Sequence, residues 1–193
     1  MIKEIKKITN SNVDYLNLQE NHISIQLSLD GYSFCVFNKI QNEIGVFAVY
    51  EFENNVISPY KHLELIEQLY KKEILLQVKY DSVSVSHFNN LVTQVPQSFF
   101  DKNNLENYLQ HTVKVLENDF ISYDEVLNSE IVNVYIPFVN INNFLLDQYG
   151  AFIYKHSSTI LIEKLLNNYK NLDGDYCFVN VSKNNFEIII LKN

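Results

Sequence analysis

Hydrophobic and polar residues follow a two-residue period most regularly in the stretch 22–52. In its first part small polar residues separate the apolar ones, which are Ile23, Ile25, Leu27 and Leu29. Such alternation is typical of a β-strand with one buried face. Two further runs, 32–37 and 44–52, are apolar at nearly every position. The stretch therefore predicts a three-strand antiparallel meander whose second and third strands are covered on both faces.

The dipeptide Asp30-Gly31 separates the first two of these strands. Asp-Gly between two β-rich runs is a strong hairpin signal, because a two-residue turn requires positive φ angles that glycine adopts without steric cost. We therefore expect Gly31 to lie in the turn with a positive φ.

Helical spacing and short β-like runs alternate in the rest of the chain. Ser58-Pro59 predicts the N-cap and first residue of a helix that ends near Lys72. The other expected helices begin at Asp101, ending near residue 117, at Asn140, ending before Gly150, and at Ser157 or Ser158. Strands are expected at 74–80, 83–85, 120–126, 131–139 and 151–154, with a loop at 95–100.

A second hairpin of the opening type is expected at the end of the chain. Residues 177–193 can be aligned with 23–39, with Asn184-Asn185 in place of Asp30-Gly31, and asparagine also tolerates positive φ. The likeness has two interpretations: a repeat of the opening unit, or two hairpins that resemble each other by chance. The apolar strand of this hairpin needs neighbours. We therefore expect either a piece of a longer protein, or a hairpin buried against the first sheet or a partner chain.

The composition favours a globular protein that binds neither nucleic acid nor membrane. The net charge is −8, and all 15 cationic side chains are lysines. Phosphate backbones require clustered positive charge, and guanine is usually read by the arginine fork that this chain lacks. No run approaches the roughly 18 apolar residues of a membrane span, and the first residues carry charges throughout.

Cysteine usage fits a reducing compartment. Cys35 and Cys177 fall inside expected strands, without the spacing of metal ligands, so we expect two buried free thiols. Together with the absence of a signal peptide, this predicts a cytoplasmic protein.

Four segments carry a resemblance to a known family. They read HISIQLSLDGYSF at 22–34, QVPQSFF at 94–100, VYIPFV at 134–139 and GDYCFVNV at 174–181. On these segments the chain resembles the bacterial family DUF3822, whose members have the actin-like ATPase (actin, Hsp70 and hexokinase-like) fold. The resemblance implies an α/β fold with a mixed sheet that opens with the antiparallel meander. It also implies duplicated domains, each opening with a hairpin.

This resemblance implies a division of the chain into three parts. Residues 1–21 form a lead-in, in which Val13, Tyr15, Leu16 and Leu18 are candidates for an edge strand or a packed arm. Residues 22–172 form the first actin-like domain. Residues 173–193 form the opening hairpin of a second domain, which a truncated chain would leave incomplete.

The only candidate cofactor-binding positions lie at the first hairpin. In active actin-like ATPases this hairpin holds an aspartate followed closely by glycine and small hydroxyl residues, so that backbone N–H groups contact phosphate while the carboxylate orients metal-bound water. The matching residues here are Asp30, Gly31 and Ser33, but Tyr32 is bulky and no lysine lies in the turn. The second hairpin has neither carboxylate nor glycine. Asp30 is therefore either a turn residue, the favoured interpretation, or a metal-orienting carboxylate.

Other catalytic signatures are absent from the sequence. It contains no glycine-rich phosphate loop, no His-Glu-x-x-His and no Gly-x-Ser-x-Gly. The five histidines are dispersed, which favours solvated or capping roles over metal or acid-base roles. His156-Ser157-Ser158 could place a nucleophile beside a base, but serine at a helix start favours capping. We therefore expect no catalytic residue and no metal ligand.

Three functions are compatible with the sequence. The favoured one is a non-catalytic binding or scaffolding module, with a protein partner or self-association and no cofactor. The first alternative is an active hydrolase or phosphotransferase that uses ATP and Mg²⁺. The second is a purely structural protein-interaction domain. A second carboxylate that faces Asp30 across a cleft would favour the enzyme, since phosphoryl transfer needs metal and charge stabilisation from both sides.

Overall fold

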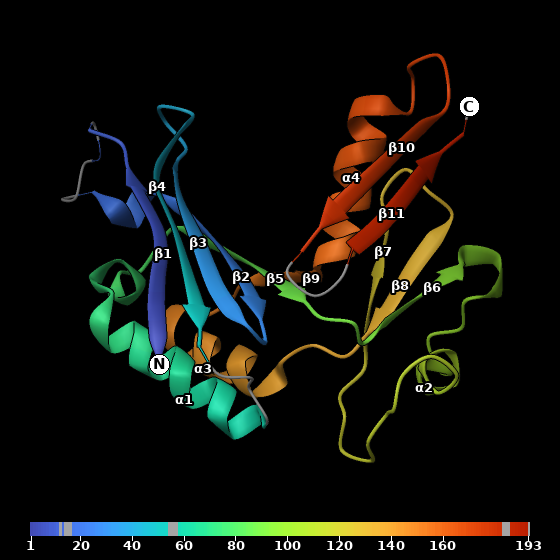
Figure 1. Ribbon diagram of the computed structural model, residues 1–193, viewed down its shortest axis with the longest axis horizontal. Coiled ribbons are helices and arrows are strands. Elements are labelled where there is room, and N and C mark those ends of the chain that lie inside the picture. Colours follow the sequence, from blue (N-terminus) through green and yellow to red (C-terminus); the bar gives the residue numbers. More distant parts are fainter. Residues whose placement is uncertain (12, 14–16, 54–57, 183–185, 193) are drawn as a thin grey trace.

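A computed structural model describes every residue except 12, 14–16, 54–57, 183–185 and 193. Its elements form two lobes (Figure 1). The first lobe is a six-stranded sheet in the order β1-β4-β3-β2-β5-β9. Its strands are β1 (Ile2–Thr9), β2 (His22–Ser28), β3 (Gly31–Asn38), β4 (Glu43–Phe52), β5 (Ser82–Phe88) and β9 (Ile153–His156).

The meander expected from the sequence is confirmed as β2, β3 and β4, which pair antiparallel in that order. β5 pairs parallel with the other side of β2, and β9 pairs parallel with β5. The mixed α/β sheet opening with an antiparallel meander is therefore confirmed.

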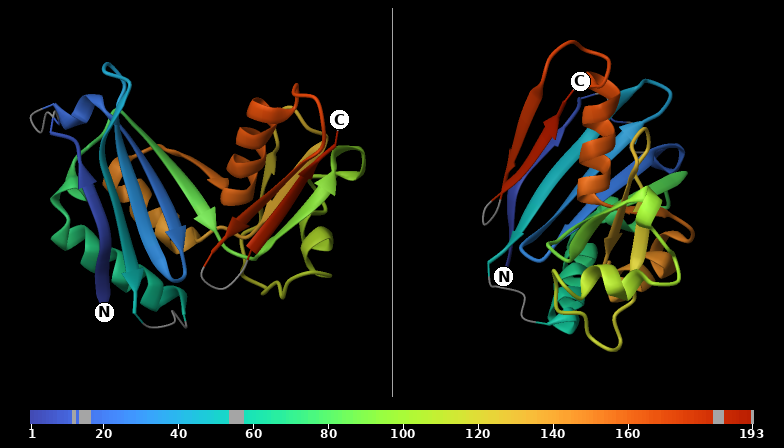
Figure 2. Two further views of the ribbon diagram at one scale, coloured as in Figure 1. Left: turned by 45° about the horizontal axis from the view of Figure 1, so that its top comes forward. Right: turned by 90° about the vertical axis from the view of Figure 1, so that its right-hand side faces the viewer.

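Two helices cover one face of this sheet (Figure 2). They are α1 (Pro59–Lys72) and α3 (Val139–Tyr149). Ser58 caps α1 by accepting a hydrogen bond from the Lys61 N–H at 3.3 Å, and Gly150 ends α3 with a φ of 79°. The core beneath them combines β2, β3 and β4 with Ile66 and Leu69 of α1 and Ile141 and Leu145 of α3.

The expectation that β3 and β4 are covered on both faces is wrong. Buried and half-buried residues alternate along both strands, so only the face toward α1 and α3 is closed. An apolar run could not reveal this, because its composition does not say how many layers pack on the sheet.

The second lobe consists of a three-stranded antiparallel sheet, two helices and a hairpin (Figure 1). The sheet has the order β6-β8-β7 and its own small core around Val95, Leu109 and Val134. The elements are β6 (Val92–Pro96), α2 (Leu105–Leu109), β7 (Ser122–Glu125), β8 (Ile131–Tyr135), α4 (Ser157–Tyr169), β10 (Tyr176–Val181) and β11 (Phe186–Leu191).

Three expected elements are corrected by the structure. Residues 74–80 do not form a strand: a 3-10 helix, Ile74–Gln77, buries the adjacent Leu75 and Leu76, whereas a strand would point them to opposite faces. The helix expected to begin at Asp101 and end near residue 117 spans only Leu105–Leu109, with Asn104 as its N-cap, and the N–H and hydroxyl of Thr112 both donate to the Leu109 carbonyl just after it. Part of the loop expected at 95–100 belongs to β6.

The lead-in fits the packed-arm alternative rather than the edge strand, and the second cysteine differs from expectation. The edge strand is β1, paired with β4, and lies before the residues proposed for it. Of those candidates, Leu18 is buried in a 3-10 helix, Leu18–Glu20, Val13 packs partly buried against the core, and Tyr15 and Leu16 lie outside the described residues. Both cysteines are free, but Cys35 is half-buried and Cys177 is exposed, so the prediction of two buried thiols is wrong.

The closing hairpin is confirmed as β10 and β11, but it does not join either larger sheet among the described residues. The two strands form a two-stranded sheet that packs on α4, where the Tyr169 ring lies 4.7 Å from that of Phe178. Asn184-Asn185, expected at its turn, lie outside the described residues.

A buried polar network lies where β9 of the first lobe leads into α4 of the second. The Asp124 carboxylate accepts hydrogen bonds from the His156 N–H and the Thr159 hydroxyl, both at 2.8 Å, and from the Tyr135 hydroxyl at 3.1 Å. Asn133 donates to Thr159 at 2.7 Å. Burial raises the pKa of Asp124, while these three donors lower it. The network therefore connects the start of α4 to β7 and β8.

Replacing Asp124 with alanine should destabilise the fold. Three buried donors would lose their acceptor, and each unsatisfied group costs about 1–3 kcal/mol. We expect Asp124→Ala to lower the free energy of unfolding in urea by about 3 kcal/mol or more. Asp147→Ala, at an exposed carboxylate on α3, is the control and should change it by less than about 0.5 kcal/mol. Equal effects of the two variants would contradict the assigned role of Asp124.

Gly31 begins β3 and does not lie in the turn. Ser28 pairs with Gly31 across the hairpin, so the turn residues are Leu29 and Asp30. Among the described residues, the positive φ angles belong to Asn42, Asn128, Gly150 and Gly174. The expected positive φ of Gly31 is therefore wrong. Glycine is required there for space, because a Cβ would lie 2.5 Å from the Tyr50 carbonyl oxygen.

The close approach of Gly31 to Tyr50 gives a direct test. Gly31→Ala should destabilise the protein by about 1–3 kcal/mol, because a backbone oxygen in a paired strand cannot move aside. Gly45→Ala is the matched strand control: its Cβ would meet the Val13 side chain at 3.3 Å, and a side chain can shift. Urea denaturation measures both variants, and a Gly31→Ala protein as stable as Gly45→Ala would refute the explanation.

Candidate functional site

A cleft of about 870 Å³ lies between the two lobes. This volume lies within the range of small-molecule sites. The cleft is formed by the first hairpin turn, the start of α1, the segment after β5, the loop 114–120, the segment from β8 into α3, and Ser182.

The position of the cleft follows from the sheet. β2 and β5 run parallel, so their carboxyl ends, at Ser28 and Phe88, lie side by side. Ligands of open α/β sheets commonly bind beyond the carboxyl ends of the strands. The starts of α1 and α3 reach the same place, where the Asn140 side chain donates to the Pro59 carbonyl at 2.7 Å.

Both hairpins of the chain contribute to this cleft. The first supplies Ser28, Leu29 and Asp30, and the second supplies Ser182, the residue that follows β10. The end of β10 therefore lies near the turn of the first hairpin, although more than half of the chain separates the two in sequence.

The three candidate cofactor-binding residues are not all brought to the cleft. Asp30 lines it, half-buried, and its carboxylate accepts a hydrogen bond from the Ser28 hydroxyl at 2.7 Å. Gly31 and Ser33 do not line it: Gly31 pairs with Ser28 and Glu51, and Ser33 pairs with Gln26 and Val49 inside the sheet.

The charged residues lining the cleft are one lysine and two aspartates, Lys114, Asp30 and Asp119. Asp119 comes from the opposite lobe, and its carboxylate accepts the Leu116 N–H at 2.8 Å. A second carboxylate therefore lines the same cleft as Asp30. Sequence spacing gave no signal for Asp119 or Lys114, because only the packing of the lobes brings them near the first hairpin.

Apolar and amide side chains make up much of the remaining lining. The apolar ones include Leu29, Phe88, Leu91, Leu116, Phe120 and Phe138, and the amides are Asn89, Asn90, Asn118, Asn140 and Asn143. Amide side chains both donate and accept hydrogen bonds without carrying charge. The cleft can therefore bind apolar surface and orient uncharged polar groups.

His62 forms part of the cleft wall in its neutral form. Burial lowers its pKa to about 4, although a hydrogen bond to the backbone of Ser28 opposes the shift. Its Nε2 has no hydrogen-bond partner among the described residues, so Nδ1 makes the bond to Ser28. The ring packs edge-on against Phe138, with centroids 4.9 Å apart.

His156 and Ser158 have structural roles. The His156 Nδ1 lies 2.7 Å from the Ser158 hydroxyl and accepts the Ser158 N–H at 3.2 Å, so the histidine caps α4. Its Nε2 lies 3.1 Å from the Asn89 carbonyl, which can only accept, so Nε2 carries the proton. Both side chains are buried and neither lines the cleft. The expectation that Ser157 or Ser158 caps this helix is wrong, because both serines lie inside α4 and His156 is the cap.

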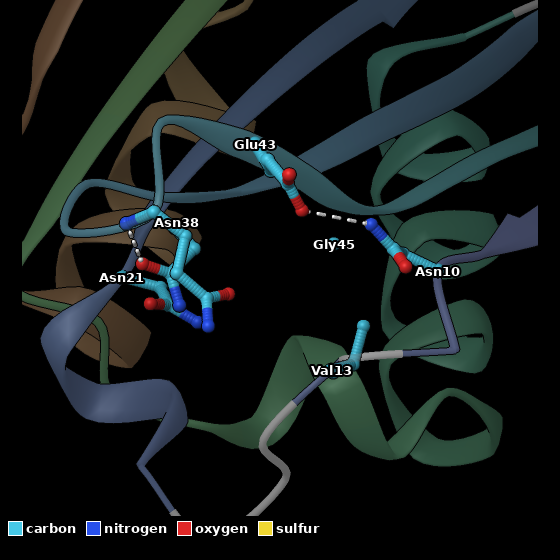
Figure 3. Close-up of a pocket in the computed structure, with 7 residues that line it drawn as sticks. Asn10, Val13, Asn21, Asn38, Glu43 and Gly45 are labelled. Atoms are coloured by element: carbon cyan, nitrogen blue, oxygen red, sulfur yellow. Dashed lines mark hydrogen bonds between the residues drawn. The ribbon is translucent and has the colours of Figure 1, made fainter.

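A second, small hollow lies at the opposite end of β3 (Figure 3). Its volume is about 10 Å³, enough for one water molecule. Asn10 reaches into it and donates to the Glu43 carboxylate at 3.2 Å. The hollow is too small for an organic ligand.

The described residues contain no group of three or more His, Cys, Asp or Glu side chains that could hold a metal ion. In the same part of the chain, no helix is long and apolar enough to cross a membrane.

Three buried histidines should make stability depend on pH. Burial lowers the pKa of His62 and His156 to about 4 and that of His87 to about 3. The unfolded chain binds these protons near pH 6.5, whereas the folded protein excludes them until the pH approaches 4. Stability is therefore present above pH 6.5 and is lost as the pH falls through this window, by about 1.4 kcal/mol per pH unit for each titrating histidine.

Urea denaturation between pH 7 and pH 5 tests this dependence. We expect His62→Gln to reduce the slope of unfolding free energy against pH. His111→Gln, at an exposed position, should leave the slope unchanged. A wild-type protein equally stable across this window would show that folding does not lower the pKa of these histidines.

One solved structure supports the fold. A protein from Bacteroides thetaiotaomicron VPI-5482, described as having an actin-like ATPase fold and unknown function, superimposes with a TM-score of 0.82 at 20% identity. The match covers 93% of this chain and 68% of that one. No curated protein matches the sequence significantly. The likeness shows the fold alone.

The family assignment rests on most of the chain. A profile of proteins of unknown function, DUF3822, matches residues 10–193. This range includes both hairpins and all the residues that line the cleft. The chain therefore belongs to the DUF3822 family and has the actin-like ATPase fold.

Proposed function

We propose that this protein is a non-catalytic binding module whose interlobe cleft holds an uncharged, largely apolar organic ligand. The observation that carries the proposal is the lining of the cleft, in which phenylalanine, leucine and asparagine side chains outnumber one lysine and two aspartates. Ligand sites commonly combine an apolar wall with a few polar groups that fix orientation.

The charges in the cleft do not fit a nucleoside triphosphate. One lysine against two aspartates leaves the lining with a net negative charge, since His62 is neutral at pH 7. Proteins that transfer phosphoryl groups supply cations and backbone N–H groups to the phosphates. Here the lining supplies a single lysine, Lys114, which is exposed.

Polar groups of the first hairpin already form hydrogen bonds within the protein. The Asp30 carbonyl accepts the Phe52 N–H at 2.9 Å, and Gly31 is paired in the strand ladder. The Ser28 hydroxyl donates to the Asp30 carboxylate and approaches the Gly31 carbonyl at 3.1 Å. This arrangement supports a turn role for Asp30.

Binding in the cleft can be tested with two kinds of probe. Uncharged heteroaromatic fragments should perturb the NMR signals of Asn90, Leu91 and Phe138, because their side chains line the cleft. Mg²⁺-ATP at millimolar concentration should neither perturb these signals nor raise the melting temperature, and the protein should show no Mg²⁺-dependent ATP hydrolysis above background.

Matched variants make the fragment test specific. Asn143→Trp adds bulk at an exposed position of the cleft wall and should weaken fragment binding about tenfold or more. Asn168→Trp, at an exposed position on α4 outside the cleft, should leave binding unchanged. Fragments that bind elsewhere, or equally well to both variants, would overturn the proposal.

A second candidate function is an Mg²⁺-dependent hydrolase or phosphotransferase. The observation in its favour is that Asp30 and Asp119, from opposite lobes, line one cleft. Under this function ATP raises the melting temperature in the presence of Mg²⁺, and Asp30→Asn abolishes the shift. That result would reverse the order of the two candidates.

A further inference from the structure

The closing hairpin exposes an apolar face. Directly paired residues of antiparallel strands lie on the same face of a sheet, and so do alternate residues along each strand. The register pairs Cys177 with Ile190, Val179 with Ile188 and Val181 with Phe186, so these residues share one face. All six side chains are exposed, and we call this set the hairpin face: Cys177, Val179, Val181, Phe186, Ile188 and Ile190.

The opposite face of the hairpin is the one that packs on the molecule. It carries Tyr176, Phe178, Ile189 and Leu191, which are half-buried, and the rings of Tyr176 and Phe178 contact Tyr169 of α4. The exposure of the hairpin face is therefore not a result of a detached hairpin. One side is seated on α4, and the other side has no cover among the described residues.

The hairpin face is a contiguous apolar patch, larger than the single exposed apolar residues that are common on protein surfaces. Phe186 is 65% exposed and Val181 is 76% exposed, and the other valine and isoleucines are more than half exposed. The patch is on the order of 500 Å², within the range of the largest patches on monomers, which are often functional. Two such faces packed together remove about 1,000 Å² from water, the size at which specific interfaces begin.

We propose that the hairpin face is the interface of a symmetric homodimer, in which it packs against the same face of a second copy. The face carries no charged side chain, so two copies of a chain with net charge −8 can meet there without bringing carboxylates together. A two-fold axis places identical surfaces in contact. Two sheets packed face to face lie about 10 Å apart.

Sedimentation velocity and light scattering from low to high micromolar concentration test the proposal. The wild-type chain should shift from monomer to dimer with a dissociation constant in the micromolar range, which suits an interface near the lower size limit. Ile188→Asp should weaken the dimer about tenfold or more, because it places a charge in the centre of the face. Val179→Asp, at its cross-strand neighbour, should act in the same direction.

Two controls separate this effect from misfolding. Ile153→Asp changes an isoleucine that is 70% exposed on β9, outside the hairpin face, and should leave the dimer intact. Circular dichroism and melting temperature check that each variant folds. Alkylation of the Cys177 thiol should slow as the wild-type protein becomes dimeric, whereas the rate for Ile188→Asp should not depend on concentration.

Three results would overturn the proposal. One is a monomer at all concentrations, which would leave the face for a different partner. Another is a dimer that Ile188→Asp and Val179→Asp do not weaken, which would place the interface elsewhere. The third is growth into large aggregates without a defined dimer, which would show that the face associates non-specifically and is not self-complementary.

Discussion

The position of β2 between an antiparallel and a parallel neighbour controls the arrangement of the rest of the molecule. β3 can follow β2 through a two-residue turn, but β5 must run in the same direction as β2, so the chain crosses back through α1. The carboxyl ends of β2 and β5 therefore meet beside the first hairpin turn. The cleft, the start of α1 and the exit to the second lobe all lie at this edge.

The second lobe is held against this edge by buried polar groups rather than by a shared hydrophobic core. The Asp124 carboxylate of the second lobe accepts the N–H of His156, the last residue of β9, and the His156 ring bonds to the carbonyl of Asn89 after β5. Such bonds are directional and must be satisfied when buried. The two bonds of His156 therefore join the lobes beside the cleft, which Asn89 lines.

The charges that line the cleft do not suit a nucleotide, although the fold is that of actin-like ATPases. The cleft has the place and the volume of a ligand site, and two hairpins border it. Its lining nevertheless contains more carboxylates than cations, and the backbone of the first turn is used in the sheet. Fold and activity are separate properties, since a fold supplies positions and the side chains supply chemistry.

Most of the local elements and the family could be predicted from the sequence. Alternation predicted the meander, Ser58-Pro59 and Gly150 marked helix ends, and short segments indicated DUF3822 and its fold. Features that depend on contacts between distant segments could not be predicted in this way. Gly31 is needed because the Tyr50 carbonyl lies close to it. Leu75 and Leu76 are adjacent and both buried, which a 3-10 helix allows and a strand does not. Asp119 lines the same cleft as Asp30 because the two lobes pack together there. Periodicity records which residues prefer burial, but not which neighbours bury them.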